Sequence, residues 1–241
     1  MLAVLLVTGM SPTAWGAAAK ANPKYYWPNG IVPYLVDPSI TDPEPILKAM
    51  REWEKAGIRF PPRRAEADYV VFTLSDAAKE REAASEDDVQ EIAGAVSAVG
   101  RIGGRQQIVA RGSDVPWWRY AHEIGHTLGL FHEHLRLDRD RWVTIHRDNL
   151  DPEARRSFEI KRAKTADIGS FDVKSIMLYD WNRDAVDRRK PTISWNADPS
   201  FKEFGAPVVR KVSEGDIAAV RYLYFEGGLR KLGSHWHRRP R

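Results

Sequence analysis

The chain has 241 residues, 43% of them hydrophobic and 10% aromatic, which is typical of a folded globular domain and excludes a disordered chain. A net charge of only +4, without a basic helix that carries interleaved aromatic residues, argues against nucleic acid as a partner. There is no cysteine, so a disulfide framework is excluded and any metal site must use His, carboxylate or Tyr ligands. No run of about 18 apolar residues occurs, and we expect no membrane span.

The first residues look like the end of a signal peptide. An apolar run over residues 2–7 is followed by the small residues 16–19, with an A-x-A-like cleavage site near Ala19. A leader over residues 1–19 predicts a secreted or periplasmic protein. The apolar run is short and no Lys or Arg precedes it, so a start codon assigned too late and an unprocessed N-terminal arm are the alternatives.

The first predicted helix spans residues 42–57. Its apolar residues recur at the spacing of an amphipathic helix, which ends at Gly57; they are Ile46, Leu47, Met50 and Trp53. Short apolar runs bounded by turn residues predict strands, which lie at residues 31–36, 58–60, 69–74 and 107–110. The charged segment 75–91 is predicted as a loop or an exposed helix. Strands mixed with helices, followed by a long irregular half, predict an α+β fold.

A second predicted helix, over residues 116–128, has Ser113 or Asp114 available as its N-cap. On it His122 and His126 are four residues apart, so both imidazoles project from one face of the helix, one turn apart. That spacing lets two neutral ring nitrogens bind one zinc ion at about 2.0–2.1 Å each.

The residues that follow complete a catalytic zinc motif. Glu123 is offset from the face of the two ligands, but it can take a proton from a metal-bound water. Gly129 can adopt the left-handed conformation that ends a helix, which lets His132 fold back as a third ligand. Three protein ligands leave one position open for water, as a hydrolytic zinc site requires. The competing interpretation, a surface helix with solvent-facing His and Glu, explains the first five residues of the motif but not the rest.

The chain resembles the astacin family of metzincins. Residues 122–143 are similar to the astacin signature HExxHxxGxxHExxRxDRDxYV, and four further stretches resemble family landmarks: WPNGIVPY at 27–34, SAVGRIGGRQ at 97–106, KPTI at 190–193 and LY at 223–224. The resemblance implies an astacin-like peptidase domain over residues 25–226 and leaves a basic tail over 227–241. It also implies a two-lobed fold, with a twisted mixed β-sheet and the active-site helix in the N-terminal lobe and an irregular C-terminal lobe.

The resemblance assigns roles to residues of this chain by position. It implies one catalytic Zn²⁺ held by His122, His126 and His132, with Glu123 as the general base. Tyr179 matches a tyrosine that binds zinc in the resting enzyme as a displaceable fifth ligand and can then donate a hydrogen bond to the developing oxyanion.

Further roles implied by the resemblance are structural or concern substrate. Met177 belongs to a turn that places an apolar floor beneath the metal site, although ordinary core packing is the alternative. Glu133 matches a buried glutamate that receives the N-terminus of the processed enzyme. Residues 95–100 match the edge strand along which extended substrate lies, which makes Ala95, Ser97 and Val99 substrate-binding candidates.

This chain also departs from the family pattern. Animal members usually have two disulfides, whereas Ala95 and Asp114 stand near the positions of a cysteine pair here, as expected of a bacterial-type member that lacks disulfides. Leu178 stands where many members have His. The residues between the predicted leader and Trp27 are too few to form a full inhibitory pro-segment.

The expected function is hydrolysis of peptide bonds within proteins, by a metal-activated water and a glutamate base, in an enzyme that we expect to act as a monomer. A catalytically silent metzincin fold that binds peptides is the alternative. Another metzincin branch is disfavoured by Glu133 and by the charged run at 136–140. The resemblance also implies a preference for acidic substrate residues just after the scissile bond. A basic cluster shortly after Met177 can serve either as the pocket for such a residue or as solvated surface; it comprises Arg183, Arg188, Arg189 and Lys190.

Overall fold

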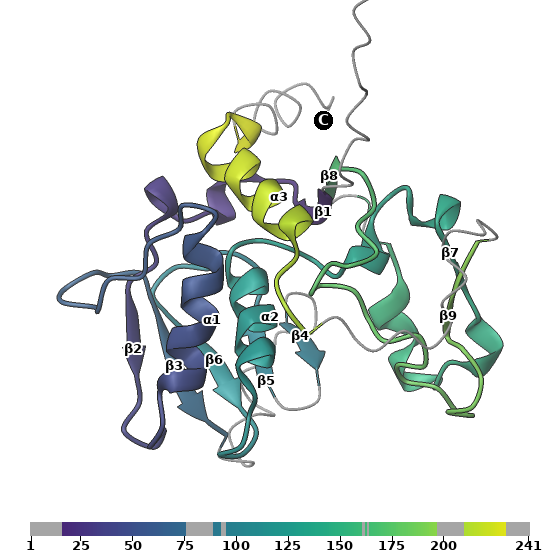
Figure 1. The fold of residues 1–241 in the computed structure, drawn as a ribbon, viewed down its shortest axis with the longest axis horizontal. Helices are drawn as coiled ribbons and strands as arrows, with labels where there is room; N and C mark the ends of the chain where they lie inside the picture. The colour runs from purple at the N-terminus through teal and green to yellow at the C-terminus, as the bar shows by residue number, and fades with distance from the viewer. Residues whose placement is uncertain are drawn as a thin grey trace, which may run out of the picture.

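The computed structural model describes residues 16–75, 89–92, 95–160, 162, 164–196 and 210–229, with the backbone alone described at 89–92. Two lobes lie side by side in Figure 1. One lobe contains the main sheet and the long helices, and the other is built mostly of turns and short helices. This arrangement confirms the predicted α+β fold with an irregular C-terminal half.

The main sheet has five strands in the order β2-β3-β6-β5-β4, with bounds Tyr34–Val36, Tyr69–Leu74, Arg105–Ala110, Ala95–Ala98 and Val89–Ile92. β2, β3 and β6 are parallel, whereas β5 and β4 run antiparallel to their neighbours, so the predicted mixed sheet is confirmed.

Three of the four predicted strands form, two of them with different bounds. The strand over 69–74 is confirmed as β3. The strand predicted over 31–36 begins later, at Tyr34, and the strand predicted over 107–110 begins earlier, at Arg105. The strand over 58–60 is wrong, because this segment forms an isolated bridge between Ile31 and Arg59 and then meets Pro61 and Pro62, which have no N–H to extend a ladder. Residues 76–88 of the predicted loop lie outside the described residues, and its last residues belong to β4.

The expectation that residues 95–100 form the edge of the sheet is also wrong. β5 is hydrogen-bonded to β6 on one side and to β4 on the other, so β4 is the edge strand. The segment after Leu74 is long enough to form one more antiparallel strand, β4. This strand hydrogen-bonds to the backbone N–H and C=O groups of β5 that would be free if β5 were the edge.

Two helices cover one face of the sheet (Figure 1). Helix α1 (Glu44–Glu54) buries the apolar stripe that its sequence predicts, and its Trp53 indole N–H donates to the carbonyl of Ala121 at 2.8 Å. Helix α2 (Trp117–Thr127) lies beside it and carries the zinc motif. The prediction of Ser113 or Asp114 as N-cap is wrong, because Pro116, in an extended conformation, immediately precedes the helix and no side chain caps it.

The predicted leader ends inside the fold. Residues Gly16–Lys20 form strand β1, which pairs antiparallel with β8 (Thr165–Gly169). The side chains of Ala17, Ala18 and Ala19 are fully buried. A cut near Ala19 would therefore remove most of a core strand, and the position of any cleavage stays a prediction.

The C-terminal lobe has its own small core around Phe158, Phe171 and Ile193, and its strands β7 (Val143–Ile145) and β9 (Ile193–Trp195) pair antiparallel. Short 3-10 helices make up the rest of its regular structure and also flank the N-terminal lobe; they are η1 (Pro23–Tyr25), η2 (Pro28–Gly30), η3 (Glu133–Leu135), η4 (Arg139–Arg141), η5 (Arg147–Asn149) and η6 (Glu153–Phe158).

A last helix, α3 (Glu214–Phe225), returns to the N-terminal lobe and packs against β1. No helix was predicted there, although Ser213 and Asp216 form a reciprocal capping box at its start. Across the described residues, none of the helices has the length and apolarity to cross a bilayer.

Candidate zinc site

Three histidine side chains converge at the C-terminal end of α2. His122 and His126 come from the helix, and His132 follows the turn after it. The Nε2 atoms lie 3.0 Å apart for His122 and His126, 3.1 Å for His122 and His132, and 3.1 Å for His126 and His132. All three side chains are buried. The structure therefore brings together the three ligands that the sequence predicts.

Backbone carbonyls orient the two helical imidazoles. Nδ1 of His122 lies 2.8 Å from the carbonyl oxygen of Ile176, and Nδ1 of His126 lies 2.8 Å from that of Leu130, so each Nδ1–H donates to a carbonyl. The Nε2 atoms of both rings are then acceptors that point at one another.

Such a cluster fits a zinc ion. Neutral acceptors cannot hydrogen-bond to one another, and a tetrahedral ion with bonds of about 2.0–2.1 Å would hold its nitrogen ligands about 3.3 Å apart. Burial lowers the pKa of all three imidazoles, to about 4 for His126, which keeps the rings neutral and available as ligands. The donor set and its spacing are those of a catalytic three-histidine zinc site.

The turn that delivers His132 depends on Gly129. This residue has φ +97°, as the sequence predicts, and a Cβ atom there would lie 2.8 Å from Cε1 of Tyr26. The N–H of Leu130 donates to the carbonyl of Gly125 at 3.0 Å and closes the helix end. Only a glycine satisfies both the backbone conformation and the close approach of the tyrosine ring.

Glu123 is fully buried beside the histidines, and among the described residues neither of its carboxylate oxygens has a hydrogen-bond partner. Burial raises the pKa of Glu123, and the charge of Arg119, one turn earlier on α2, opposes that shift. A buried carboxylate without a protein partner is free to bind water or substrate.

Met177 packs against helix α2 next to the ligand His126. Its side chain is fully buried, and a Cβ atom placed on Gly125 would lie only 2.5 Å from the Met177 sulfur. Gly125 immediately precedes the ligand His126, so the sulfur lies under the metal-binding turn of α2. The role of Met177 as the apolar floor of a metal site, which the resemblance implies, stays a prediction.

Tyr179 packs against His132 and its neighbour His134. Its ring centroid is 4.1 Å from that of His132 and 4.3 Å from that of His134. Tyr179 also lines a pocket of about 650 Å³ together with residues of the C-terminal lobe. The tyrosine is thus positioned between the metal ligands and a cavity large enough for a substrate side chain.

Two residues near the site were not predicted. His134 is buried between His132 and Phe158, with its Nε2 3.1 Å from the carbonyl oxygen of Ser157, and it packs flat against His132. Arg119 lies near Glu123. Its position four residues before Glu123 was the available signal, because residues four apart on a helix share a face.

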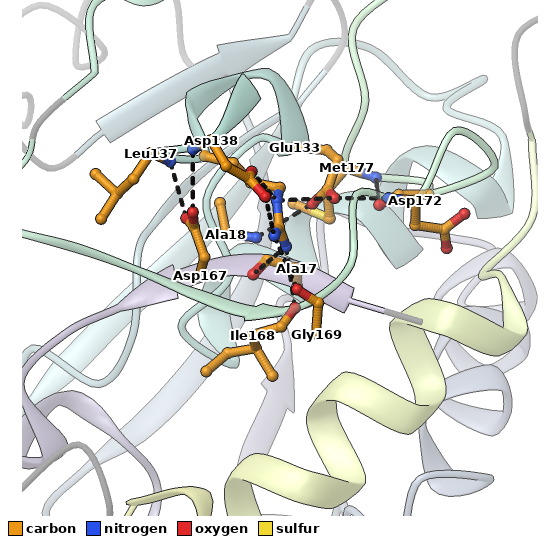
Figure 2. A network of polar contacts seen from close by, with 12 residues as sticks. Ala17, Ala18, Glu133, Leu137, Asp138, Asp167, Ile168, Gly169, Asp172 and Met177 are labelled. Atoms are coloured by element: carbon orange, nitrogen blue, oxygen red, sulfur yellow. Dashed lines mark hydrogen bonds and ion pairs between the residues drawn. The ribbon is translucent and has the colours of Figure 1, made fainter. Parts of the chain in front are cut away.

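Glu133 anchors β1 rather than facing the metal. Its two oxygens accept from the backbone N–H groups of Ala18 (3.1 Å) and Asp172 (2.8 Å). Figure 2 shows this network, in which Glu133 lies between the strand and the loop that leads to Met177. The contact to Ala18 is made by a peptide group, so the predicted ion pair with a processed N-terminus stays a prediction.

A buried arginine completes the anchorage. The guanidinium of Arg136 donates to the backbone carbonyls of Ile168 (3.0 Å) and Gly169 (2.9 Å), and its ion pair with Asp138 has an N–O distance of 2.8 Å. These contacts hold β8 against the residues that follow the metal site.

The substrate-binding candidates point into the core. Ala95, Ser97 and Val99 are each at most 1% exposed, and the Ser97 hydroxyl lies 2.9 Å from that of Thr127. Their side chains therefore support α2 from below, and the backbone of Ala95 and Ser97 pairs with β6 and with β4, so a role of these residues with substrate stays a prediction.

Known proteins match this chain over most of its length. The family model of the astacin peptidases matches residues 19–225. Astacin-like metalloprotease toxin 1 of Loxosceles intermedia is 31% identical over 216 residues, which cover 85% of this chain and 75% of the toxin. Tolloid-like protein 1 of Mus musculus is 31% identical over 86% of this chain, but the match spans only 19% of the length of that relative.

Solved structures have a fold similar to that of this chain. High choriolytic enzyme 1, a hatching enzyme zinc-protease from Oryzias latipes, matches with a TM-score of 0.65 and 26% identity, over 83% of this chain and 94% of that one. Myroilysin shares the fold, with a TM-score of 0.55 and 15% identity over 86% of this chain and 98% of that one.

The comparisons agree with the geometry of the site. Enzymes of the matching family act on proteins and are generally extracellular. The three-histidine cluster, the buried Glu123 and a family match across residues 19–225 place this chain in the astacin family of zinc endopeptidases.

Proposed function

We propose that Glu123 is the general base of this peptidase and that Tyr179 assists it at the oxyanion. The observation that supports this most directly is the Glu123 carboxylate, buried beside the three histidines with both oxygens free of protein partners among the described residues. When bound by the three histidines, zinc would supply a polarised carbonyl and an acidic water. The roles below belong to the chain's own residues.

Glu123 would move one proton twice. It takes a proton from the attacking water and then passes it to the amine that leaves when the peptide bond breaks. The position of Glu123 on α2, directly after the ligand His122, and its burial without a hydrogen-bond partner among the described residues support this role. Its burial keeps that proton away from bulk solvent.

Tyr179 would stabilise the charge that develops on the carbonyl oxygen. Its ring is held against His132 and Phe158, which restricts the positions open to its hydroxyl group. A neutral phenol is a weak zinc ligand and a good hydrogen-bond donor, so it suits a group that leaves the metal when substrate arrives.

We further propose that the enzyme is secreted or periplasmic and cuts proteins or peptides as a monomer, without nucleic acid as a partner. The apolar residues 2–7 and the small residues 16–19 support export. The generally extracellular location of astacins supports it as well. Residues 1–15 and the basic tail from Arg230 lie outside the described residues.

The test compares purified wild type with Glu123→Ala on a denatured protein substrate, with zinc content assayed in both. We expect wild type to cut and the variant to bind zinc without cutting. Removing zinc with a chelator should abolish the wild-type activity, and adding zinc should restore it. Proteolysis that survives either change would contradict the mechanism, whereas zinc and peptide binding without turnover in wild type would identify a silent binding protein.

A further inference from the structure

Among the described residues, the third zinc ligand lacks the orienting contact that the other two have. The Nδ1–H groups of His122 and His126 donate to backbone carbonyls, each at 2.8 Å. His132 presents its Nε2 to the other two ligands, at 3.1 Å from each, so the proton of its neutral ring is on Nδ1. Within the described part of the chain this Nδ1 atom is buried and has no hydrogen-bond partner. Imidazoles that bind a metal almost always donate this second N–H to an acceptor, so His132 requires one.

A second buried imidazole, that of His134, lies directly beside His132. The two ring centroids are 5.4 Å apart and the ring planes differ by 15°. The Nε2 atom of His134 lies 3.1 Å from the carbonyl oxygen of Ser157, and a carbonyl can only accept, so Nε2 carries the proton. The ring is fully buried among aromatic side chains, which favours the neutral form. The Nδ1 atom of His134 is therefore an acceptor.

The two neighbouring rings thus have complementary buried groups. The Nδ1 atom of His134, like that of His132, makes no hydrogen bond to any residue that the structure describes. One of the two atoms is a donor and the other an acceptor, and burying either of them unpaired is costly, which native proteins generally avoid. A single water molecule accepts from the first and donates to the second, and so pairs both.

His134 is well suited to fix a neighbouring ring because it is itself held on several sides. Its backbone carbonyl accepts from the buried guanidinium of Arg139 at 2.9 Å, and its ring is bonded to Ser157 in η6. The ring also contacts Phe158 and Tyr179, at centroid distances of 5.0 and 4.3 Å. An acceptor with a fixed position is what a pre-organised metal site requires of the residues behind its ligands.

Packing alone is the competing role for His134. A flat ring at this position fills the space between His132 and Phe158 whether or not it contains nitrogen. A phenylalanine ring would fill the same space without burying a polar atom, which makes an imidazole the more costly choice for packing. The nitrogen atoms are therefore the feature that a function of His134 has to explain.

We propose that His134 is a positioning residue of the zinc site, which accepts the Nδ1 proton of His132 through one bridging water. The link orients the third ligand as the two carbonyls orient the first two, and it makes Nε2 of His132 more basic toward the metal. The inference rests on the three-histidine site and goes beyond the proposed roles of Glu123 and Tyr179, so it can fail while those roles stand.

The first experiment measures the Kd for zinc by competition with a chelator. His134→Phe keeps a flat ring and removes both nitrogens, whereas His134→Gln keeps an acceptor and a donor without the ring. His134→Phe should weaken zinc binding about ten- to a hundredfold, and His134→Gln should recover part of the loss. His146→Phe is the matched control, because His146 bonds to Ser194 in the C-terminal lobe, and its zinc Kd should equal that of wild type.

Wild-type zinc affinity in His134→Phe would overturn the inference. A loss in His134→Gln as large as that in His134→Phe would overturn it too, because the acceptor would then not be the feature that matters. The Tm of each zinc-free protein is measured in parallel, so that a variant that has lost its fold is recognised.

A second measurement reads the hydrogen bond directly and needs no variant that folds poorly. In zinc-loaded wild type labelled with ¹⁵N-histidine, NMR should show a proton on Nδ1 of His132 and none on Nδ1 of His134. The His132 proton should exchange with solvent faster in His134→Phe and at the wild-type rate in His146→Phe. A proton on Nδ1 of His134, or an unchanged His132 resonance in His134→Phe, would contradict the link.

A crystal structure of the zinc-loaded protein tests the bridge itself. It should show a water within about 3 Å of both Nδ1 atoms. Any other acceptor for the Nδ1 proton of His132, from any part of the chain, would overturn the inference. Peptide cleavage is measured on the same samples, and cleavage by wild type upholds the proposed function whichever acceptor is found.

Discussion

The backbone N–H of Ala18 donates a hydrogen bond to the Glu133 carboxylate at 3.1 Å, across 115 residues of sequence. Glu133 directly follows the zinc ligand His132, and on the other side of that ligand the N–H of Phe131 donates to the carbonyl of Ala18 at 2.9 Å. The carbonyl of Ala17 accepts from Arg136, and the carbonyl of Lys20 accepts from the Tyr26 hydroxyl at 2.7 Å. The N-terminal strand is therefore part of the architecture that holds the third ligand.

Removing β1 should destabilise the enzyme. A chain that begins at Lys20 loses three wholly buried alanines and leaves the Glu133 carboxylate without one of its two backbone donors. Lost burial and unpaired groups together should lower the free energy of unfolding by about 3–6 kcal/mol. Thermal unfolding of the zinc-loaded proteins measures the effect, with a chain that begins at Gly16 as the control. Equal Tm values would show that β1 is dispensable and would agree with cleavage near Ala19.

Gly125→Ala should be destabilising because the new Cβ atom meets the Met177 sulfur at 2.5 Å and Cζ2 of Trp53 at 3.1 Å. Overpacking of a core of this kind costs about 1–3 kcal/mol, which corresponds to roughly 2–10 °C in Tm for a domain of this size.

The partner variant Met177→Ala makes that prediction specific. Met177→Ala alone should also lower Tm by leaving a cavity, but it removes the atom that Gly125→Ala collides with. The double variant should therefore be more stable than the sum of the two single losses predicts. Strict additivity would mean that the two side chains do not share the space beneath His126.

Asp216 should make stability depend on pH. Burial, followed by the negative charge of Asp172, raises the pKa of Asp216 to about 6 from its ordinary value of 3.8. Between about pH 4 and 6 the folded state keeps a proton that the unfolded state releases, so the free energy of unfolding falls as pH rises through this window and then levels off. The size of this contribution is on the order of 2–3 kcal/mol.

Asp216→Asn should remove this slope and keep the fold. The amide oxygen can accept from the N–H groups of Ile176 and Ser213, which both lie 2.9 Å from one carboxylate oxygen, and the NH₂ group can donate to the hydroxyl of Ser175. Urea denaturation of both proteins between pH 4 and 8 gives the difference. Parallel profiles across the whole range would show that Asp216 does not titrate in this window.

Tyr179→Phe should lower kcat by about a hundredfold and leave KM and zinc content nearly unchanged, because only a donor to the developing oxyanion is lost. The phenylalanine ring keeps the contacts with His132, His134 and Phe158, so the metal ligands should stay in place. Steady-state kinetics on one peptide, with zinc measured in the same samples, checks the prediction. An unchanged kcat would limit Tyr179 to packing.

The sequence by itself determined the chemistry of the metal centre. His122 and His126 share a face because the α-helix has 3.6 residues per turn, and Gly129 allows the left-handed backbone that returns His132 to the same point. The three ligands lie within a short segment, from residue 122 to residue 132, and local backbone geometry sets their relative positions. Their convergence can therefore be predicted before any tertiary contact is known.

Only the tertiary structure decided which residues surround that centre. The burial of β1, its pairing with β8, and the convergence of Arg183 and Arg210 on Arg119 join segments that are far apart in the sequence. Strand pairing and charge clustering depend on the distances between such segments, and no local periodicity encodes those distances. The resemblance implied an edge strand at Ala95, Ser97 and Val99, but in the folded chain β4 covers that edge and these side chains lie in the core.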